Sequence, residues 1–178
     1  LAAQISVTDA ELLAQLRHWY NGFCFAPQAE NVYNPFSTLH LFYHQRFSNF
    51  WIESGTPTFL IKLIRDRGYE MEQLTQLNLA EIDFSSYELE QLPIIPLLFQ
   101  TGYLTIKGTY QQQENLIYTL GYPNYEVEHA FVTYLLSAFS NLERTFARGY
   151  LHQLVDALQR RDFALFFATL DSFFANID

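Results

Sequence analysis

The chain has 178 residues, of which 49% are hydrophobic, 17% aromatic and only 16% charged. This composition excludes intrinsic disorder, and no stretch approaches the roughly 18 apolar residues of a membrane span. The first residues lack the basic start and long apolar run of a secretory signal. The net charge of −9 argues against nucleic-acid binding, because phosphate contacts need a basic surface.

The single cysteine, Cys24, excludes a disulfide framework and fits a reducing cytoplasm. The chain begins at Leu1 instead of Met, and it carries 17 Phe and 12 Tyr. That is more aromatic surface than a core of this size readily encloses. The sequence therefore predicts a piece of a longer cytoplasmic protein, which docks against other parts or self-associates through an exposed apolar patch.

The first predicted helix follows Thr8 and Glu11, which have the spacing of a capping box. Apolar residues then recur at helical spacing up to Tyr20. We expect Asn21-Gly22 to end the helix, because glycine tolerates a left-handed cap. Residues 23–32 are expected to form a loop or a short hairpin.

Two further helix starts follow. Asn34 is a cap and Pro35 stands at the first helical position, where its missing N–H costs nothing. Residues 54–57 repeat this device before a helix that Gly68 closes. Residues 71–79 are predicted to form one more short helix.

The second half begins with a compact apolar helix over Pro93–Gln100, ended by Gly102. Alternating apolar residues on both sides of a polar turn then predict a β-hairpin at about 103–120. A turn at 121–124 leads into a helix over Tyr125–Phe139.

Two last helices are expected at about Leu151–Arg160 and, capped by Asp162, at Phe163–Phe174. The fold class is mainly α (α+β), a helical bundle with a winged-helix-like hairpin.

Two common catalytic motifs are missing from the sequence. A phosphate-binding loop needs a glycine-flanked lysine followed by Ser or Thr, and neither Lys62 nor Lys107 has that context. A nuclease-like metal centre needs a carboxylate two residues before its lysine, where Leu60 and Thr105 stand. We therefore predict no catalytic, cofactor-binding or metal residue in this chain.

Weaker candidates have simpler interpretations. His40 and His44 are spaced for two zinc ligands on a helix, but no third ligand is evident. Cys24 is expected to be a small buried apolar residue. Glu126 and Glu128 are expected to stabilise the start of a helix through its dipole.

Two charged groups of residues are predicted to be solvated faces or partner contacts. One is an acidic stretch free of Lys and Arg: Glu70, Glu72, Glu81, Asp83, Glu88 and Glu90. The other is a basic concentration that could meet phosphate or a neighbouring domain: Arg144, Arg148, Arg160 and Arg161.

Five sequence blocks follow one another in a distinctive order. They are Trp19–Phe23, Val32–Ser37, Phe50–Leu60, Pro96–Ile106 and Leu120–Asn124. This order resembles the predicted AAA-ATPase-like bacterial family whose members carry a C-terminal PD-(D/E)XK nuclease-like domain. The resemblance implies an ATPase core before Leu1, with ATP and Mg²⁺ bound there, and a nuclease-like domain past Asp178.

By this resemblance, residues 1–122 are a helical lid and a winged-helix-like unit, and residues 123–178 lead toward the nuclease-like domain. The family-motif positions are expected to be structural: Trp19, Tyr20, Asn21, Gly22, Asn34, Pro35, Phe36, Gly55, Thr56, Pro57, Gln100, Thr101, Gly102 and Tyr103. The implied function is a non-catalytic connector that couples nucleotide state to a neighbouring domain. The alternatives are a DNA-contacting winged-helix module and, third, an independent metal-dependent hydrolase.

Overall fold

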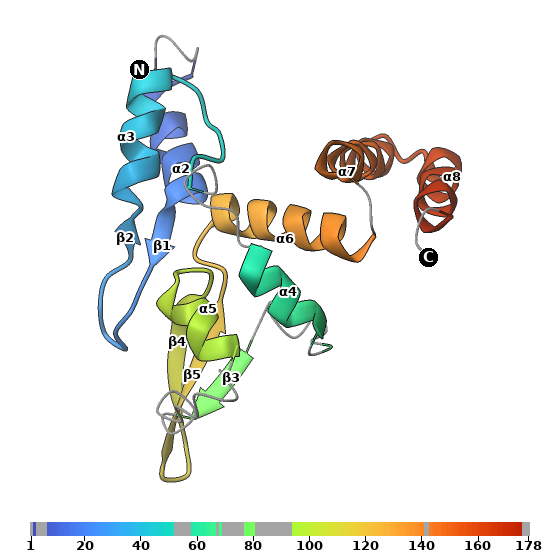
Figure 1. Cartoon of the computed structure of the whole chain (residues 1–178). Coiled ribbons are helices and arrows are strands. Elements are labelled where there is room, and N and C mark those ends of the chain that lie inside the picture. Colours follow the sequence, from blue (N-terminus) through green and yellow to red (C-terminus); the bar gives the residue numbers. More distant parts are fainter. Residues whose placement is uncertain are drawn as a thin grey trace. The chain divides into compact units, whose positions relative to one another are not determined.

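The computed structural model shows a mainly helical α+β fold, which confirms the predicted class (Figure 1). It describes residues 2, 7–51, 58–66, 68, 77–80, 94–140 and 143–175. The described elements are, in chain order, α2 (Asp9–Tyr20), β1 (Asn21–Phe23), β2 (Val32–Tyr33), α3 (Pro35–His44), α4 (Thr58–Asp66), β3 (Leu77–Ala80), α5 (Ile94–Gln100), β4 (Thr105–Gln112), β5 (Asn115–Gly121), α6 (Tyr125–Phe139), α7 (Arg144–Gln159) and α8 (Phe163–Phe174).

Side-chain caps start the first two of these helices as predicted. The Thr8 hydroxyl accepts a hydrogen bond from the Glu11 N–H at 3.3 Å, and the Glu11 carboxylate accepts one from the Thr8 N–H at 2.8 Å. Asn34 Oδ1 accepts from the next two free N–H groups of α3, and Pro35 occupies the first turn. Strands β1 and β2 pair between the two helices, so the short hairpin is confirmed.

The end of α2 lies where we predicted, but the reason we gave is wrong. Asn21 is extended with φ −92° instead of left-handed, and Gly22 lies in β1 with φ +127°. A Cβ on Gly22 would stand 2.0 Å from the carbonyl oxygen of Pro123. Glycine is required here because another backbone passes against it, and not because a helix needs a cap.

The second sheet has the strand order β3-β5-β4 and contains the predicted hairpin (Figure 1). The short helix expected over residues 71–79 is wrong where the structure describes it, because Leu77–Ala80 is strand β3. This segment pairs antiparallel with β5, from Leu77 opposite Leu120 to Ala80 opposite Ile117. Pairing with a strand about forty residues later thus overrides the local helical pattern. The predicted helix start at 54–57 and residues 71–76 lie outside the described ranges.

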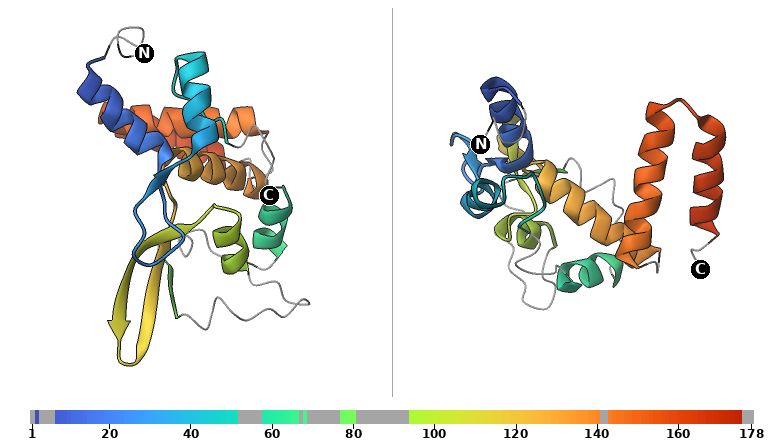
Figure 2. Two further views of the ribbon diagram at one scale, coloured as in Figure 1. Left: turned by 90° about the vertical axis from the view of Figure 1, so that its left-hand side faces the viewer. Right: turned by 90° about the horizontal axis from the view of Figure 1, so that it is seen from above.

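The last three helices follow the sequence closely, with one shifted boundary. α6 and α8 have the predicted limits, and Asp162 Oδ1 caps α8 by accepting from the Leu165 N–H at 3.0 Å. α7 begins at Arg144, well before the predicted 151, because Gly149 lies inside the helix without ending it. α7 and α8 run antiparallel side by side, with Tyr150 and Phe173 in edge contact (Figure 2).

The chain divides into two compact units, residues 1–130 and 131–178. A cluster of Tyr20, Leu41 and Phe50 forms a core in the first unit, and the partly buried Trp19 and Phe47 pack against it. In the described ranges, no helix has the length and apolar character needed to cross a bilayer.

Candidate functional site

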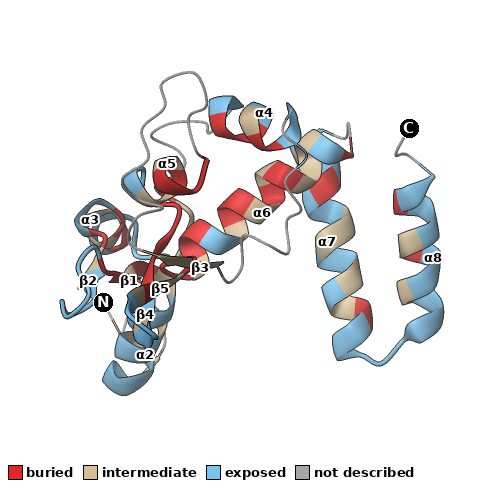
Figure 3. Ribbon diagram, turned by 90° about the horizontal axis from the view of Figure 1, so that it is seen from below, coloured by how far each residue is buried: buried red, intermediate tan, exposed pale blue. Residues whose placement is uncertain are grey.

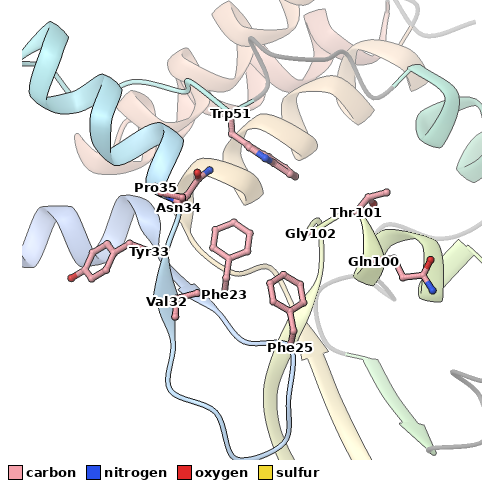
Figure 4. Close-up of a pocket in the computed structure, with 10 residues that line it drawn as sticks. All are labelled: Phe23, Phe25, Val32, Tyr33, Asn34, Pro35, Trp51, Gln100, Thr101 and Gly102. Atoms are coloured by element: carbon pink, nitrogen blue, oxygen red, sulfur yellow. The ribbon is translucent and has the colours of Figure 1, made fainter.

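A pocket of about 290 Å³ opens in the first unit, where segments distant in sequence meet (Figure 4). Its lining is mostly apolar and aromatic: Phe23, Phe25, Val32, Tyr33, Asn34, Pro35, Trp51, Gln100, Thr101 and Gly102. Five of the predicted family-motif positions are among these residues, namely Asn34, Pro35, Gln100, Thr101 and Gly102. Four of the five sequence blocks thus contribute residues to one pocket.

Three aromatic rings gather inside the pocket, whereas the Tyr33 ring points away from them (Figure 4). Phe23 lies between the other two, with ring centroids 6.2 Å from Phe25 and 6.5 Å from Trp51. Gly102, with φ +80°, lets the chain turn close to two of these rings. A Cβ there would lie 3.6 Å from both the Phe23 and the Trp51 ring.

Thr105 ties the aromatic segment to the hairpin. Its hydroxyl accepts from the Cys24 N–H at 2.6 Å and donates to the Cys24 carbonyl at 2.7 Å. The Ile106 N–H donates to the same carbonyl at 3.0 Å. This buried link fixes the chain between Phe23 and Phe25, and so it sets where their rings lie.

A buried carboxylate joins two walls of the pocket. Glu126 is fully buried, and its Oε1 accepts from the Ser37 hydroxyl at 2.8 Å and from the N–H groups of Phe50 at 2.8 Å and Trp51 at 3.0 Å. The Glu126 carbonyl also accepts from the Asn49 side-chain amide at 3.1 Å. Glu126 therefore connects the start of α6 to the first turn of α3 and to the segment that carries Trp51.

Sequence reasoning missed this role of Glu126. Both Glu126 and Glu128 lie in the first turn of α6 as expected, but only Glu128 is exposed. Their spacing resembles an ordinary acidic helix start, and no local pattern shows that the partners are 75 to 89 residues earlier in the chain. The unusual signal was a hydroxyl residue, Ser37, just inside a helix already capped by Asn34.

Two buried tyrosines make the folded state less stable at alkaline pH. Burial is the main cause that raises the pKa of Tyr20 to about 12. The hydrogen bond with Ser48 lowers this pKa, and the negative charge of Glu126 raises it further. Burial, with the charge of Glu128, likewise raises the pKa of Tyr122 to about 12. The unfolded chain ionises first, near the ordinary pKa of 10, so this stability is complete below pH 10 and is lost as the pH rises toward 12.

We therefore expect the free energy of unfolding to fall by roughly 2 kcal/mol between about pH 9.5 and about pH 11.5, measured by urea denaturation. Tyr122→Phe should remove about half of this fall. Burial lowers the pKa of Lys107, which acts with the opposite sign, so the difference between wild type and Tyr122→Phe is the decisive quantity. An identical pH dependence of the two proteins would contradict the prediction.

The remaining family-motif residues do not line the pocket in the described part of the chain. Tyr103 packs against Trp51 with ring centroids 4.9 Å apart, and Tyr20 belongs to the core. Trp19 contacts Phe47 and Tyr125. Asn21 and Gly22 form β1, and Phe36 is exposed on α3. Gly55, Thr56 and Pro57 lie outside the described residues.

The histidine and cysteine candidates have structural surroundings. His40 and His44 stack on each other at 5.5 Å and on Phe50. In the described part of the chain, no three His, Cys, Asp or Glu side chains group as metal ligands. Cys24 is buried, as predicted, and its Sγ lies 3.2 Å from the Ala26 carbonyl.

The four arginines of the predicted basic concentration lie at the two ends of α7. Arg144 and Arg148 stand at the start of α7, whereas Arg160 and Arg161 follow its end, about 24 Å along the helix at 1.5 Å per residue. Arg160 is paired with Asp156 at 2.9 Å. Arg148 lines a hollow together with Thr145, Gly149 and His152.

Comparison with known proteins gives one curated relative. An uncharacterized protein in the vnfD 5′ region of Azotobacter chroococcum mcd 1 is 35% identical over 168 residues. The match covers 92% of this chain but 31% of the relative, so the chain spans about a third of the relative's length. No family model matches the sequence, and no solved structure matches it.

Proposed function

We propose that this chain is a non-catalytic connector within a longer ATPase–nuclease-like protein, where it couples nucleotide state to a neighbouring domain. The resemblance of its ordered sequence blocks supports this proposal. The relative supports it as well, because the matching segment is 31% of that protein and has covalent neighbours there to dock against. An exposed apolar face on the chain itself is the observation that carries the proposal.

That face lies on α8. Phe163, Phe167 and Phe174 are 58%, 60% and 61% exposed. At 100° per residue these three rings fall within about 40° of one another around the helix. Thr169 and Phe173, roughly 100–140° around the helix from the centre of this face, are buried. Most of α8 is exposed (Figure 3). Three exposed phenylalanines in line on one helix are an unusual surface for an isolated domain and a normal one for a docking element.

The test uses the full-length Azotobacter relative, with this chain exchanged for the matching segment. We expect ATP turnover by this hybrid and none by the 178-residue chain. Changing Phe163, Phe167 and Phe174 together to Ser should lower hybrid turnover roughly tenfold or more, because docking anchors carry most of an interface's free energy. Phe59→Ser is the matched control, since Phe59 is equally exposed, at 61%, on α4.

Two outcomes would contradict the connector proposal. One is a full-length relative without ATP turnover, and the other is a triple serine variant as active as the hybrid. Circular dichroism of each variant separates lost docking from lost folding.

One observation favours a second function, a DNA-contacting winged-helix module. The three-stranded sheet β3-β5-β4 with its long hairpin has the form of a wing. However, the hairpin's single lysine, Lys107, donates to the Pro123 carbonyl at 3.0 Å, and α6 contains no Lys or Arg. Nanomolar binding of duplex DNA with a steep salt dependence, in a competition assay on the same proteins, would favour this function over the connector.

A further inference from the structure

The aromatic pocket combines two features that attract a cation, namely aromatic rings and nearby negative charge. The rings of Phe23, Phe25 and Trp51 line it, and none of the described lining residues is Lys, Arg or His. Ring faces carry partial negative charge and attract cations. The pocket volume of about 290 Å³ suits a small organic group.

The charges behind the walls have the same sign. The Glu126 carboxylate lies 3.0 Å from the Trp51 N–H and 2.8 Å from the Ser37 hydroxyl, directly behind two lining segments. Gln100 and Thr101, at the end of α5, form the opposite wall and add no positive charge. The start of α3 would favour an anion, but Asn34 Oδ1 already accepts from its Phe36 and Ser37 N–H groups.

We propose that this pocket binds an alkylated ammonium group. A bare metal ion needs several oxygen ligands, and the lining offers mainly ring carbon. A primary ammonium is strongly hydrated and loses its water at high cost, whereas N-methyl groups pack against rings and spread the charge. This site is independent of the connector role, because it needs only the first unit.

The probes are choline, its neutral carbon isostere 3,3-dimethylbutan-1-ol, and sodium acetate. Binding is followed by the fluorescence of the 178-residue chain carrying Trp19→Phe, which leaves Trp51 as its one tryptophan. We expect saturable quenching by choline, at least roughly tenfold weaker binding of the isostere, and none of acetate. A trimethyl-lysine peptide, compared with choline, distinguishes a protein-borne ammonium group from a free small molecule.

Two variants test the role of the rings in the aromatic pocket. Phe25→Leu removes one ring that is already 52% exposed, so the fold should tolerate it, and choline affinity should fall roughly tenfold. Phe59→Leu changes an equally apolar, exposed position on α4 that does not line the pocket, and affinity should stay unchanged.

The results that would overturn the proposal are distinct. Equal affinity for choline and its neutral isostere would show an apolar pocket without charge recognition. Binding of acetate but not choline would show an anion site. Unchanged choline affinity in Phe25→Leu would place any binding elsewhere on the chain. None of these outcomes depends on ATP turnover, so the connector proposal is tested separately.

Discussion

Gly22→Ala is expected to lower the free energy of unfolding by roughly 3 kcal/mol or more, because two costs add. Alanine would be strained at φ +127°, and its Cβ would fall 2.0 Å from the Pro123 carbonyl oxygen. That oxygen belongs to the backbone between β5 and α6, so it cannot move without shifting the chain there, and Lys107 Nζ donates to it at 3.0 Å. Urea denaturation followed by circular dichroism measures the change.

The matched control for this substitution is Gly108→Ala. Gly108 lies in β4 of the same unit, and a Cβ there would meet no atom within 4 Å. Its effect should stay within about 0.5 kcal/mol. If both variants were equally stable, the close approach of the first strand to the 121–124 turn would be wrong.

Glu126→Ala is the second substitution with a large expected effect, again a loss of roughly 3 kcal/mol or more. It removes the acceptor of three buried hydrogen bonds and leaves the N–H groups of Phe50 and Trp51 without it. Glu126→Gln keeps one oxygen at the same place and should lose less, about half as much.

The control for Glu126 is Glu128→Ala, two residues later in the same first turn and exposed. It should change stability by at most about 0.5 kcal/mol. Thermal denaturation of the three variants in one buffer ranks them. Equal melting of Glu126→Ala and Glu128→Ala would show that the buried carboxylate does not hold the segments together.

Local rules explain why most helix limits were predictable. The capping box at Thr8, the Asn34-Pro35 pair and the Asp162 cap act within one helical turn, so their spacing is visible in the sequence. Strand β3 was not predictable in this way, since its partner β5 lies about forty residues later. A local pattern does not report a distant neighbour.

The site shows the same division. The lining residues Asn34, Pro35, Gln100, Thr101 and Gly102 stood out in the sequence blocks, yet their meeting in one pocket did not. Only tertiary contacts bring Phe23 and Trp51 beside Gly102 and bury Glu126 behind them. The ordered sequence blocks therefore drew attention to individual residues, and the structure shows that these residues line the same pocket.

The position of Glu126 also has a consequence for synthesis on the ribosome. Phe50 leaves the peptidyl transferase centre 76 residues before the carboxylate that accepts its N–H. At 5–20 residues per second this interval is about 4–15 s. During that time the apolar surfaces of Tyr20, Leu41 and Phe50 are not yet held by the hydrogen bond between Phe50 and Glu126. Until Glu126 is synthesised, these apolar surfaces are therefore less protected from aggregation than they are in the finished fold.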